Sequence, residues 1–463
     1  MVVGEGGVEV RPVSQQQEAA GRIAVLLLAG HAQGSISTAR RRTVVLPREI
    51  AIGRDGPNSW SSVPFDDPWM SDQHARLVSS ASGEYFVQDC GSTNGTWLDG
   101  ACIRSGPARK LRTGSVLMVG GHVFVFRQVT PNELAAMYED WDCPFAPVPT
   151  LSPAMAVSAR KLRQLAAANF DMLLSGETGV GKEVHAEAIH RASGRKGPFV
   201  AINCAAIPDC LLESELFGYA RGAHSTANRP KAGLIEQANG GTLFLDEIGE
   251  MSYFAQAKLL RFLQDRRLLS LGTTRARTLD VLVVAATHRV PAPDQPATEG
   301  LRYDLAARLG PEPVILPPLK ERVEDVGLLT GFFAKGEGAF APEAYLSLFL
   351  HTWKGNVREL EKVVQVARIL AAGCPAIGLD HLPRRLTAWF DSDPAKPPTP
   401  RQRPTRDELL ALLGHHAGDV AELARELGRQ RTLVWRWLRE YELRPSDFRE
   451  TIPRMPVAAS GSS

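Results

Sequence analysis

Two short motifs carry the residues best suited to phosphate chemistry. The first motif, GETGVGKE, follows the strand-like run FDMLLS and opens a helical pattern. Glycines in such a loop let backbone N–H groups wrap phosphates at a helix N-terminus, while Lys182 can reach the β- and γ-phosphates. The strict pattern has Ser or Thr where Glu183 stands. The predicted phosphate-binding residues are Gly176, Glu177, Thr178, Gly179, Val180, Gly181, Lys182 and Glu183.

The second motif is an apolar strand, GTLFLDE, that ends in two carboxylates. We expect Asp246 to hold Mg²⁺ and Glu247 to orient or polarise an attacking water. Alone, either motif could be a plain strand–helix turn or a plain strand end. Together, in this order and strand context, the two motifs indicate a phosphoryl-transfer site.

Length and composition set the frame for these motifs. A chain of 463 residues, 44% hydrophobic and 22% charged, predicts two to four globular domains. The longest apolar run, residues 23–29, is far too short to span a membrane, and the first twenty residues lack a secretory signal. The six cysteines form no CxxC pair, so we expect reduced thiols in a cytoplasmic protein. A net charge of +2 means that nucleic-acid binding would need a local basic surface.

The pattern along the chain predicts a multidomain protein. Short β-rich runs broken by turn signals predict an all-β sandwich over 21–130, after a flexible tail at 1–20. Alternating strand and helix patterns over 151–386 predict an α/β domain with a parallel sheet, which becomes a helical lid after Pro317-Pro318. The remaining predicted parts are a linker at 131–150, a Pro-rich linker at 387–405, an all-α domain at 406–445 and a tail at 446–463.

Seven colinear blocks over 151–386 point to one family. They are GETGVGKE, FVAINCAAIPDCLLESELFG, GGTLFLDEIGEM, VVAATHR, LRYDLAARL, LPPLKERVEDV and WKGNVRELEKVV. The segment resembles the AAA+ domain of bacterial enhancer-binding proteins, which remodel sigma-54 RNA polymerase. The resemblance implies ATP and Mg²⁺ at the phosphate motifs and assembly into a ring, a hexamer in this family.

The resemblance also implies roles for further residues. Asn203 would hold Glu247 until nucleotide is in place, and Thr287 with His288 would lie beside the γ-phosphate. Arg302 and Arg308 would be arginine fingers that reach the neighbouring subunit's ATP. Arg358 would be a lid arginine at the nucleotide. For Arg302 or Arg308 alone, a surface salt bridge is the alternative.

One loop departs from the family pattern. The polymerase-contacting loop reads GAFTGA in the family, where its Phe and Thr touch sigma-54. Here Phe becomes His, which loses apolar area, Thr becomes Ser, and Gly becomes Thr, which restricts the backbone. These changes leave ATPase chemistry untouched and put engagement of sigma-54 in question. The loop residues are Gly222, Ala223, His224, Ser225, Thr226 and Ala227.

Three motifs in the β-rich region, GR at 53–54, SDQH at 71–74 and DCGSTNGT at 89–96, resemble those of the forkhead-associated (FHA) domain. That fold binds phosphothreonine peptides with its loops. The resemblance implies that Arg54 and Ser71 bind the phosphate and that Thr93 and Asn94 contact the peptide. A sandwich that no longer binds is the alternative, since Asp72 would repel phosphate slightly.

The C-terminal segment 418–443 resembles the Fis-type helix-turn-helix. Its basic stretch holds five arginines against one acid, which suits a helix that enters the DNA major groove. A solvated amphipathic helix is the alternative. The expected DNA-facing residues are Arg429, Arg431, Thr432, Trp435 and Arg436.

We therefore predict a transcriptional activator that binds upstream DNA, hydrolyses ATP and opens promoters with sigma-54 RNA polymerase. Its FHA domain would recognise a phosphothreonine protein, or the Ser/Thr kinase itself. The alternative is a phosphopeptide-responsive DNA-binding regulator whose ATPase governs assembly without sigma-54 contact. Sequence-specific DNA binding would exclude a third interpretation, an ATPase with no DNA role.

Overall fold

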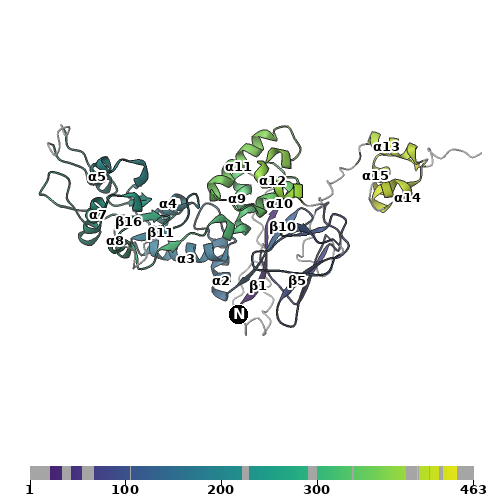
Figure 1. Cartoon of the computed structure of the whole chain (residues 1–463), viewed down its shortest axis with the longest axis horizontal. Coiled ribbons are helices and arrows are strands. Elements are labelled where there is room, and N and C mark those ends of the chain that lie inside the picture. The colour runs from purple at the N-terminus through teal and green to yellow at the C-terminus, as the bar shows by residue number, and fades with distance from the viewer. Residues whose placement is uncertain are drawn as a thin grey trace, which may run out of the picture. The chain divides into compact units, whose positions relative to one another are not determined.

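The computed structural model describes residues 21–33, 43–54, 67–104, 106–221, 229–289, 300–335, 338–392, 404, 406–416, 418–426 and 431–445 (Figure 1). The chain divides into two compact units, Met1–Lys396 and Pro397–Ser463. Within the described ranges, every helix is too short or too polar to cross a bilayer. The predicted tails at 1–20 and 446–463 and the loop Gly222–Ala227 lie outside the described residues.

The first part of the larger unit is the expected sandwich of two antiparallel sheets. The larger sheet has the strand order β2-β1-β10-β9-β6-β7 and the smaller one β3-β4-β5-β8. The bounds are β1 Ile23–His31, β2 Thr43–Val45, β3 Glu49–Ile52, β4 Ala75–Ser79, β5 Tyr85–Asp89, β6 Thr96–Leu98, β7 Ala101–Cys102, β8 Arg109–Lys110, β9 Val116–Val119 and β10 His122–Val129.

Strand β1 is apolar on both faces because both faces are covered. It pairs with β10 from Ile23 opposite Val129 to His31 opposite His122. Alternate side chains such as Leu26 pack between the two sheets. The opposite side chains pack against helices, which explains the unbroken run IAVLLLA better than a one-sided strand would.

The segment expected as a linker at 131–150 contains helix α2, Pro131–Asp142. Thr130 and Glu133 form a reciprocal capping box, and Pro131 occupies the first helical turn. Proline is favoured at that position, so Pro131 marks a helix start. The helix packs against α3, Pro153–Ala167, through buried apolar residues. The linker expected here therefore contains a helix, because Pro131 directly follows the N-cap Thr130, where a proline starts a helix rather than breaking it.

The central domain is a parallel sheet in the order β12-β13-β16-β11-β17, with helices on both faces. Alternate residues of each strand point to opposite faces: Leu174, Phe244 and Val284 meet α3 and α4. Leu173, Leu243 and Val283 meet α5, α7 and α8. The bounds are β11 Met172–Ser175, α4 Lys182–Ser193, β12 Phe199–Asn203, α5 Asp209–Phe217, α6 Leu234–Gln237, β13 Thr242–Asp246, α7 Tyr253–Asp265, β14 Arg267–Leu268, β15 Arg277–Thr278, β16 Leu282–Thr287, α8 Tyr303–Leu309 and β17 Val314–Ile315.

A helical lid follows the sheet, as expected. It comprises α9 Val326–Phe333, α10 Pro342–Leu350, α11 Asn356–Leu370 and α12 Arg384–Ser392. Short 3₁₀ turns punctuate the unit: η1 Cys204–Ala206, η2 Ile248–Glu250, η3 Leu319–Glu321, η4 Val323–Asp325 and η5 Leu379–His381.

The sandwich and the lid share one apolar core. Helices α9 and α10 lie against the sandwich strands β1 and β9, on the side of the sandwich where Figure 1 shows the lid. Backbones approach closely there: a Cβ on Gly30 would lie 2.1 Å from the Tyr345 hydroxyl, and one on Gly327 would lie 2.0 Å from Ala29 O. A buried ion pair borders this core, with Arg127 Nη2 2.6 Å from Glu324 Oε2. Only glycine fits at these crossings, so the β1–β10 edge and the lid are built to contact each other.

The second unit is a small helical domain with its own core. Its helices are α13 Arg406–His415, α14 Val420–Glu426 and α15 Arg431–Glu440. The buried core residues are Leu409, Leu413, Val420, Leu423, Ala424, Val434, Trp437, Leu438 and Leu443.

Candidate nucleotide and phosphopeptide sites

The carboxyl ends of the parallel strands bring the predicted phosphate residues together. Asn203 on β12 lies in register with Asp246 on β13. Ser175 on β11 lies in register with Thr287 on β16, and Gly176 N donates to Thr287 O at 3.2 Å. Residues far apart in sequence therefore meet at one edge of the sheet, where ligands bind in open α/β folds.

The glycine-rich loop has the backbone that a phosphate cradle needs. Gly179 has φ +83° and Gly181 has φ +103°, a region that L-residues with a side chain rarely adopt. A Cβ on Gly179 would lie 2.4 Å from Gly355 O of the lid. Helix α4 starts directly after Gly181, so its free N–H groups lie at the loop.

Lys182 and Glu247 are already paired. Lys182 Nζ lies 3.0 Å from Glu247 Oε1 and 3.0 Å from Gly176 O, with side-chain exposures of 6% for Lys182 and 15% for Glu247. Glu247 itself has φ +52° at the turn after β13. Burial acts to raise its pKa, but hydrogen bonds from His288 and Lys182 outweigh burial and leave that pKa below its ordinary value. Glu247 is thus held ionised.

The neighbouring carboxylate behaves differently. Burial raises the pKa of Asp246, and the Glu247 charge adds to the rise while Lys182 opposes it. A further cation beside Asp246 would offset this cost of burying its charge. The carboxylate's oxygen donors are those that Mg²⁺ prefers, so Asp246 fits the predicted Mg²⁺ ligand.

Asn203 contacts Asp246 rather than the predicted partner, Glu247. Its Nδ2 donates to Asp246 Oδ2 at 3.4 Å, and its Oδ1 accepts from Ala205 N. Lys182 and His288 hold Glu247 instead. The predicted hold of Asn203 on Glu247 is not among the described contacts, because strand register places Asn203 beside Asp246.

The end of β16 reaches the site through His288. The Thr287 side chain is buried, and its hydroxyl donates to Arg289 O at 2.8 Å. His288 Nδ1 lies 2.7 Å from Glu247 Oε2. Thr287 thus shapes the turn, and His288 makes the contact with the acidic pair.

The lid grips the glycine-rich loop. Asn356 Nδ2 donates to Glu177 Oε2 at 3.0 Å and to Thr178 O at 3.1 Å. Arg358 N donates to Gly179 O at 3.3 Å, which places the predicted lid arginine at the loop. Asn356 is fully buried with φ +53°, a conformation that asparagine tolerates better than most residues. Sequence reasoning named Arg358 and missed Asn356, although both stand in the block GNVRE.

Two more buried polar residues brace this loop. Arg322 is 5% exposed, and its Nη2 donates to Val180 O at 2.8 Å. His185 Nδ1 donates to Gly181 O at 2.8 Å, and burial lowers its pKa to about 4, so the ring stays neutral. The only sequence signal for Arg322 was a charge beside apolar residues in LPPLKERV, and His185 had no signal.

The two candidate arginine fingers are bonded within their own region of the chain. Arg302 precedes α8 and forms an ion pair with Asp304, Nη2 to Oδ2 at 2.7 Å. Arg308 Nη2 donates to Leu263 O at 2.9 Å, at the end of α7. Of the two, Arg302 has the more easily broken contact, because a partly exposed ion pair contributes little stability.

The four predicted phosphopeptide residues lie on two adjoining loops of the sandwich. Arg54 N donates to Ser71 O at 3.0 Å, and Thr93 N donates to Ser71 Oγ at 3.1 Å. Asn94 Nδ2 donates to Trp69 O at 2.8 Å. Ser71 is therefore the point at which both loops meet.

The buried His74 links these two loops by hydrogen bonds. It is fully buried, and its Nδ1 accepts from Ser71 N at 3.0 Å. Its Nε2 then carries the proton and donates to Gly95 O at 3.1 Å. Burial lowers the pKa of His74, which keeps this neutral tautomer.

The phosphate-directed arginine has an acidic partner. Arg54 Nη2 lies 2.8 Å from Asp72 Oδ1, with side-chain exposures of 43% and 61%. Asp72 thus occupies the guanidinium that a phosphate would need. The predicted repulsion is in fact a competing ion pair.

Most of the predicted DNA-facing residues lie on α15. Trp435 is 44% exposed, whereas its neighbour Val434 is buried. The turn at 427–430, which contains Arg429, lies outside the described residues. The helix also carries Arg431, Thr432 and Arg436, whose side chains are not described.

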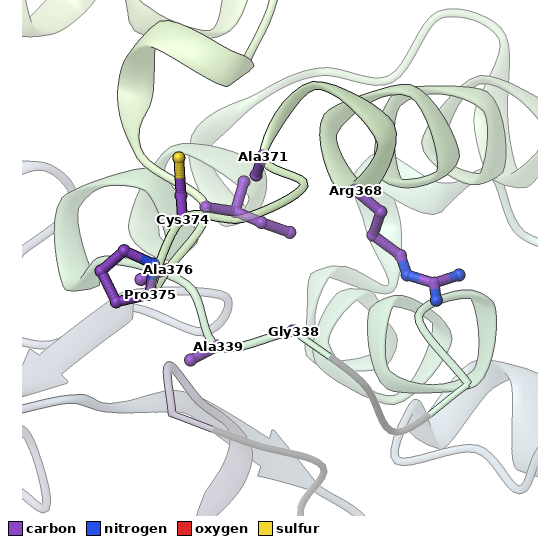
Figure 2. Close-up of a pocket in the computed structure, with 8 residues that line it drawn as sticks. Gly338, Ala339, Arg368, Ala371, Cys374, Pro375 and Ala376 are labelled. Carbon is purple, nitrogen blue, oxygen red and sulfur yellow. The ribbon is translucent and has the colours of Figure 1, made fainter.

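Figure 2 shows an open hollow in the lid. Its lining includes Gly338, Ala371 and Cys374, with Arg368 as its charged side chain. Small apolar residues dominate this lining, and the predicted site residues do not contribute to it. It therefore adds no group to the phosphate chemistry.

Three family matches cover the larger unit. Residues 50–120 match the FHA domain, residues 149–314 the sigma-54 interaction domain, and residues 320–397 the AAA+ ATPase lid domain. These ranges agree with the sandwich, the parallel-sheet domain and the helical lid.

Curated relatives extend the same assignment. The chain is 38% identical over 310 residues to the transcriptional regulatory protein GlrR of Escherichia coli (strain K12), covering 65% of this chain and 69% of that protein. It is 37% identical over 317 residues to the regulatory protein AtoC of that organism, covering 64% and 68%. Among solved structures, NtrX from Brucella abortus in complex with ADP is 31% identical with a TM-score of 0.46, covering 63% and 69%. This chain belongs to the family of sigma-54-dependent transcriptional regulators, and it carries an FHA domain ahead of its AAA+ ATPase domain.

Proposed function

We propose that this protein hydrolyses ATP to remodel sigma-54 RNA polymerase at promoters, under the control of a phosphothreonine-bearing partner in a Ser/Thr kinase pathway. The partner binds the FHA domain, and helices α13–α15 bind upstream DNA. The active assembly is a ring, a hexamer as in the family. Family membership, the paired phosphate motifs and the recognition loops support this proposal.

The roles at the nucleotide site follow from charge and position. Lys182 leaves Glu247 for the β- and γ-phosphates when ATP enters, because a triphosphate attracts the ammonium more strongly than one carboxylate. Glu247 keeps its contact with His288 but loses Lys182, so one of its oxygens can then polarise the attacking water. Asp246 would hold Mg²⁺, which supplies charge neutralisation to the phosphates.

Hydrolysis depends on assembly in this proposal. Arg302 and Arg308 are paired within their own chain, near α8. Family membership supports their role as arginine fingers, which would leave these partners to reach a neighbouring subunit's ATP. Breaking the Arg302–Asp304 pair costs little, because the pair is partly exposed.

The observation that carries FHA control is the continuous path from sandwich to nucleotide loop. The β1–β10 edge shares a core with the lid, and the lid holds Gly179 and Glu177 through the start of α11. A phosphopeptide that shifts the sandwich against the lid would therefore change the loop that binds ATP. Such coupling requires that the peptide bind the two arrangements with different affinity.

Open-complex formation tests the proposal most directly. Purified protein, sigma-54 holoenzyme and a promoter with its upstream site should give ATP-dependent opening that increases with the phosphopeptide. Glu247→Gln protein is the matched control, because it should bind ATP and DNA without opening the promoter. Opening by Glu247→Gln protein at the wild-type level would refute the role of the ATPase.

A second candidate function rests on the altered loop Gly222–Ala227. If its sequence GAHSTA no longer engages sigma-54, the ATPase governs assembly on DNA alone. Restoring the family residues with His224→Phe, Ser225→Thr and Thr226→Gly should then create promoter opening. Unchanged opening in the restored protein would argue against this candidate.

A further inference from the structure

Three potential metal ligands meet at one end of the sandwich, beyond both sites already described. His31 ends β1, His122 begins β10, and Asp67 comes from the segment that leads to Ser71. One ligand atom of each lies within 4.8 Å of the others. Asp67 is fully buried and His122 is 8% exposed. These two side chains are shielded from water, and the His31 side chain is 19% exposed.

One nitrogen in this cluster has no satisfactory partner. His31 Nε2 is buried without a hydrogen bond, and it lies 3.9 Å from Asp67 Oδ2. If Nε2 carries a proton, that distance is too long for a hydrogen bond. If it does not, its lone pair faces a carboxylate oxygen. A cation between the two atoms would give the His31 nitrogen the partner that it lacks.

The spacing suits a small divalent ion. Ligand atoms bound at about 2.0–2.2 Å from one ion lie about 3–3.6 Å apart. His122 Nδ1 shares a hydrogen bond with Asp67 Oδ2 at 2.8 Å, so a bound ion would replace the proton between them. His31 Nε2 lies 3.9 Å from Asp67 Oδ2, slightly above the range. Because all three ligand atoms lie within 4.8 Å of one another, side-chain adjustment alone could bring them to a common centre.

The surrounding backbone is arranged for this close approach. A Cβ on Gly120 would lie 2.6 Å from Asp67 Oδ2, and one on Gly121 would lie 3.2 Å from His31 Nε2. Gly121 N also donates to Asp67 Oδ2 at 2.8 Å, and Trp69 N donates to Oδ1 at 2.9 Å. These hydrogen bonds orient the carboxylate, as outer contacts do in metal sites.

We propose that His31, Asp67 and His122 bind a divalent transition metal of the Zn²⁺ class. Two imidazoles with one carboxylate favour Zn²⁺ and similar ions over Mg²⁺ or Ca²⁺, which prefer oxygen ligands. Water completes the coordination. The bound ion fastens the segment before Ser71 to strands β1 and β10.

This placement has a consequence that rests on the proposed phosphopeptide function. Trp69, two residues after Asp67, accepts the Asn94 side-chain hydrogen bond through its carbonyl. Fixing Asp67 would therefore fix part of the recognition loop. Metal binding itself is measured without peptide, so its failure and the failure of phosphopeptide recognition are separate results.

The test is a Zn²⁺ titration of the chelator-treated, nucleotide-free full chain by calorimetry, with Co²⁺ absorption as a second readout. Wild-type protein should bind one equivalent more than His31→Gln protein, and only wild type should show the visible Co²⁺ band from this site. His31→Gln is a mild change, because the replaced Nε2 makes no hydrogen bond. His415→Gln, on the exposed end of α13, is the control and should bind as wild type does.

A second variant guards against indirect effects. His122→Gln should lose the same equivalent, and Zn²⁺ should raise the unfolding temperature of wild type but of neither cluster variant. Equal stoichiometry and affinity in wild type, His31→Gln and His122→Gln would overturn the proposal. So would a Co²⁺ spectrum that neither substitution changes.

Discussion

The nucleotide site and the FHA recognition site solve the same problem in different surroundings. Each holds the cation that we propose binds a phosphate against a carboxylate: Lys182 against Glu247 and Arg54 against Asp72. The first pair is largely buried, with exposures of 6% and 15%, whereas the second is open to water at 43% and 61%. Similar distances therefore describe very different interactions.

This difference in burial indicates which of the two ion pairs has the stronger effect on its site. In a buried site the effective dielectric is low, so each charge depends strongly on its partner or on the ligand that replaces it. In water the same contact contributes about 0–1 kcal/mol. The Lys182–Glu247 pair should therefore control chemistry, while the Arg54–Asp72 pair should only adjust affinity. A third pair joins a fully buried carboxylate, Glu324, to a guanidinium that is 16% exposed, Arg127, and neither residue belongs to the two phosphate sites.

The largest effect is expected at the buried pair in the nucleotide site. Glu247→Gln should lower ATP turnover by about 10²–10⁴-fold, because the general base is lost, while ATP binding persists. Phosphate release and binding of a fluorescent nucleotide measure the two quantities. Glu250→Gln, an exposed acid three residues along, is the control and should hydrolyse ATP normally. Normal turnover in Glu247→Gln would place the base elsewhere.

The Arg127–Glu324 pair lies outside both proposed phosphate sites, so it shows the effect of burial on an ion pair without any effect of ligand binding. Arg127→Met should destabilise the larger unit by about 3–5 kcal/mol, since it leaves Glu324 buried without its cation. Denaturant unfolding of the full chain measures this change, and Arg109→Met on the exposed strand β8 should cost little. A loss below about 1 kcal/mol for Arg127→Met would mean that water reaches the pair.

The same pair predicts a pH dependence. Burial raises the pKa of Glu324 to about 7, while Arg127 opposes the rise. Because the folded-state pKa is raised, the folded state binds the proton more tightly than the unfolded state. This contribution to stability is full below the ordinary glutamate pKa and is lost as pH rises through about 7. Glu324→Gln should remove this component of a stability–pH profile, and an unchanged profile would contradict it.

A smaller effect is expected at the exposed site. Arg54→Ala should weaken binding of a phosphothreonine peptide by about 1.5–3 kcal/mol, the usual contribution of a hydrogen bond to a charged group. Calorimetric titration of the full chain measures the affinity. Arg76→Ala is a matched control, because Arg76 forms a comparably exposed pair with Glu49 on the sheet. Equal peptide affinity in both variants would remove Arg54 from the phosphate site.

The smallest effect distinguishes competition from simple repulsion. Asp72→Asn frees the Arg54 guanidinium, so phosphopeptide affinity should rise by up to about fivefold, within the 0–1 kcal/mol of an exposed pair. The gain should shrink at high salt, which screens exposed charges. Glu49→Gln, in the matched pair, should leave affinity unchanged. A loss of affinity in Asp72→Asn would show that Asp72 supports the loop.

Local sequence patterns were sufficient for most of the architecture. Alternating hydrophobicity and turn residues indicated the sandwich, and strand–helix alternation with GETGVGKE and GTLFLDE indicated the nucleotide-binding domain. Helix α2 was missed, although Thr130 and Glu133 form a capping box there. The position of Pro131 directly after Thr130 is a local feature, so the sequence alone could have predicted this helix.

The sequence by itself determined which residues can do phosphate chemistry, because loop glycines, a lysine and strand-end carboxylates follow one another at short range. Only the tertiary structure decided their partners. Strand register placed Asn203 beside Asp246. Packing of the lid brought Asn356 to the glycine-rich loop, and folding of the sandwich brought Asp72 to Arg54. The tertiary structure also placed the sandwich on the lid and gathered His31, Asp67 and His122. Such contacts join residues from distant parts of the chain, and their strength depends on burial, which periodicity along the sequence does not specify.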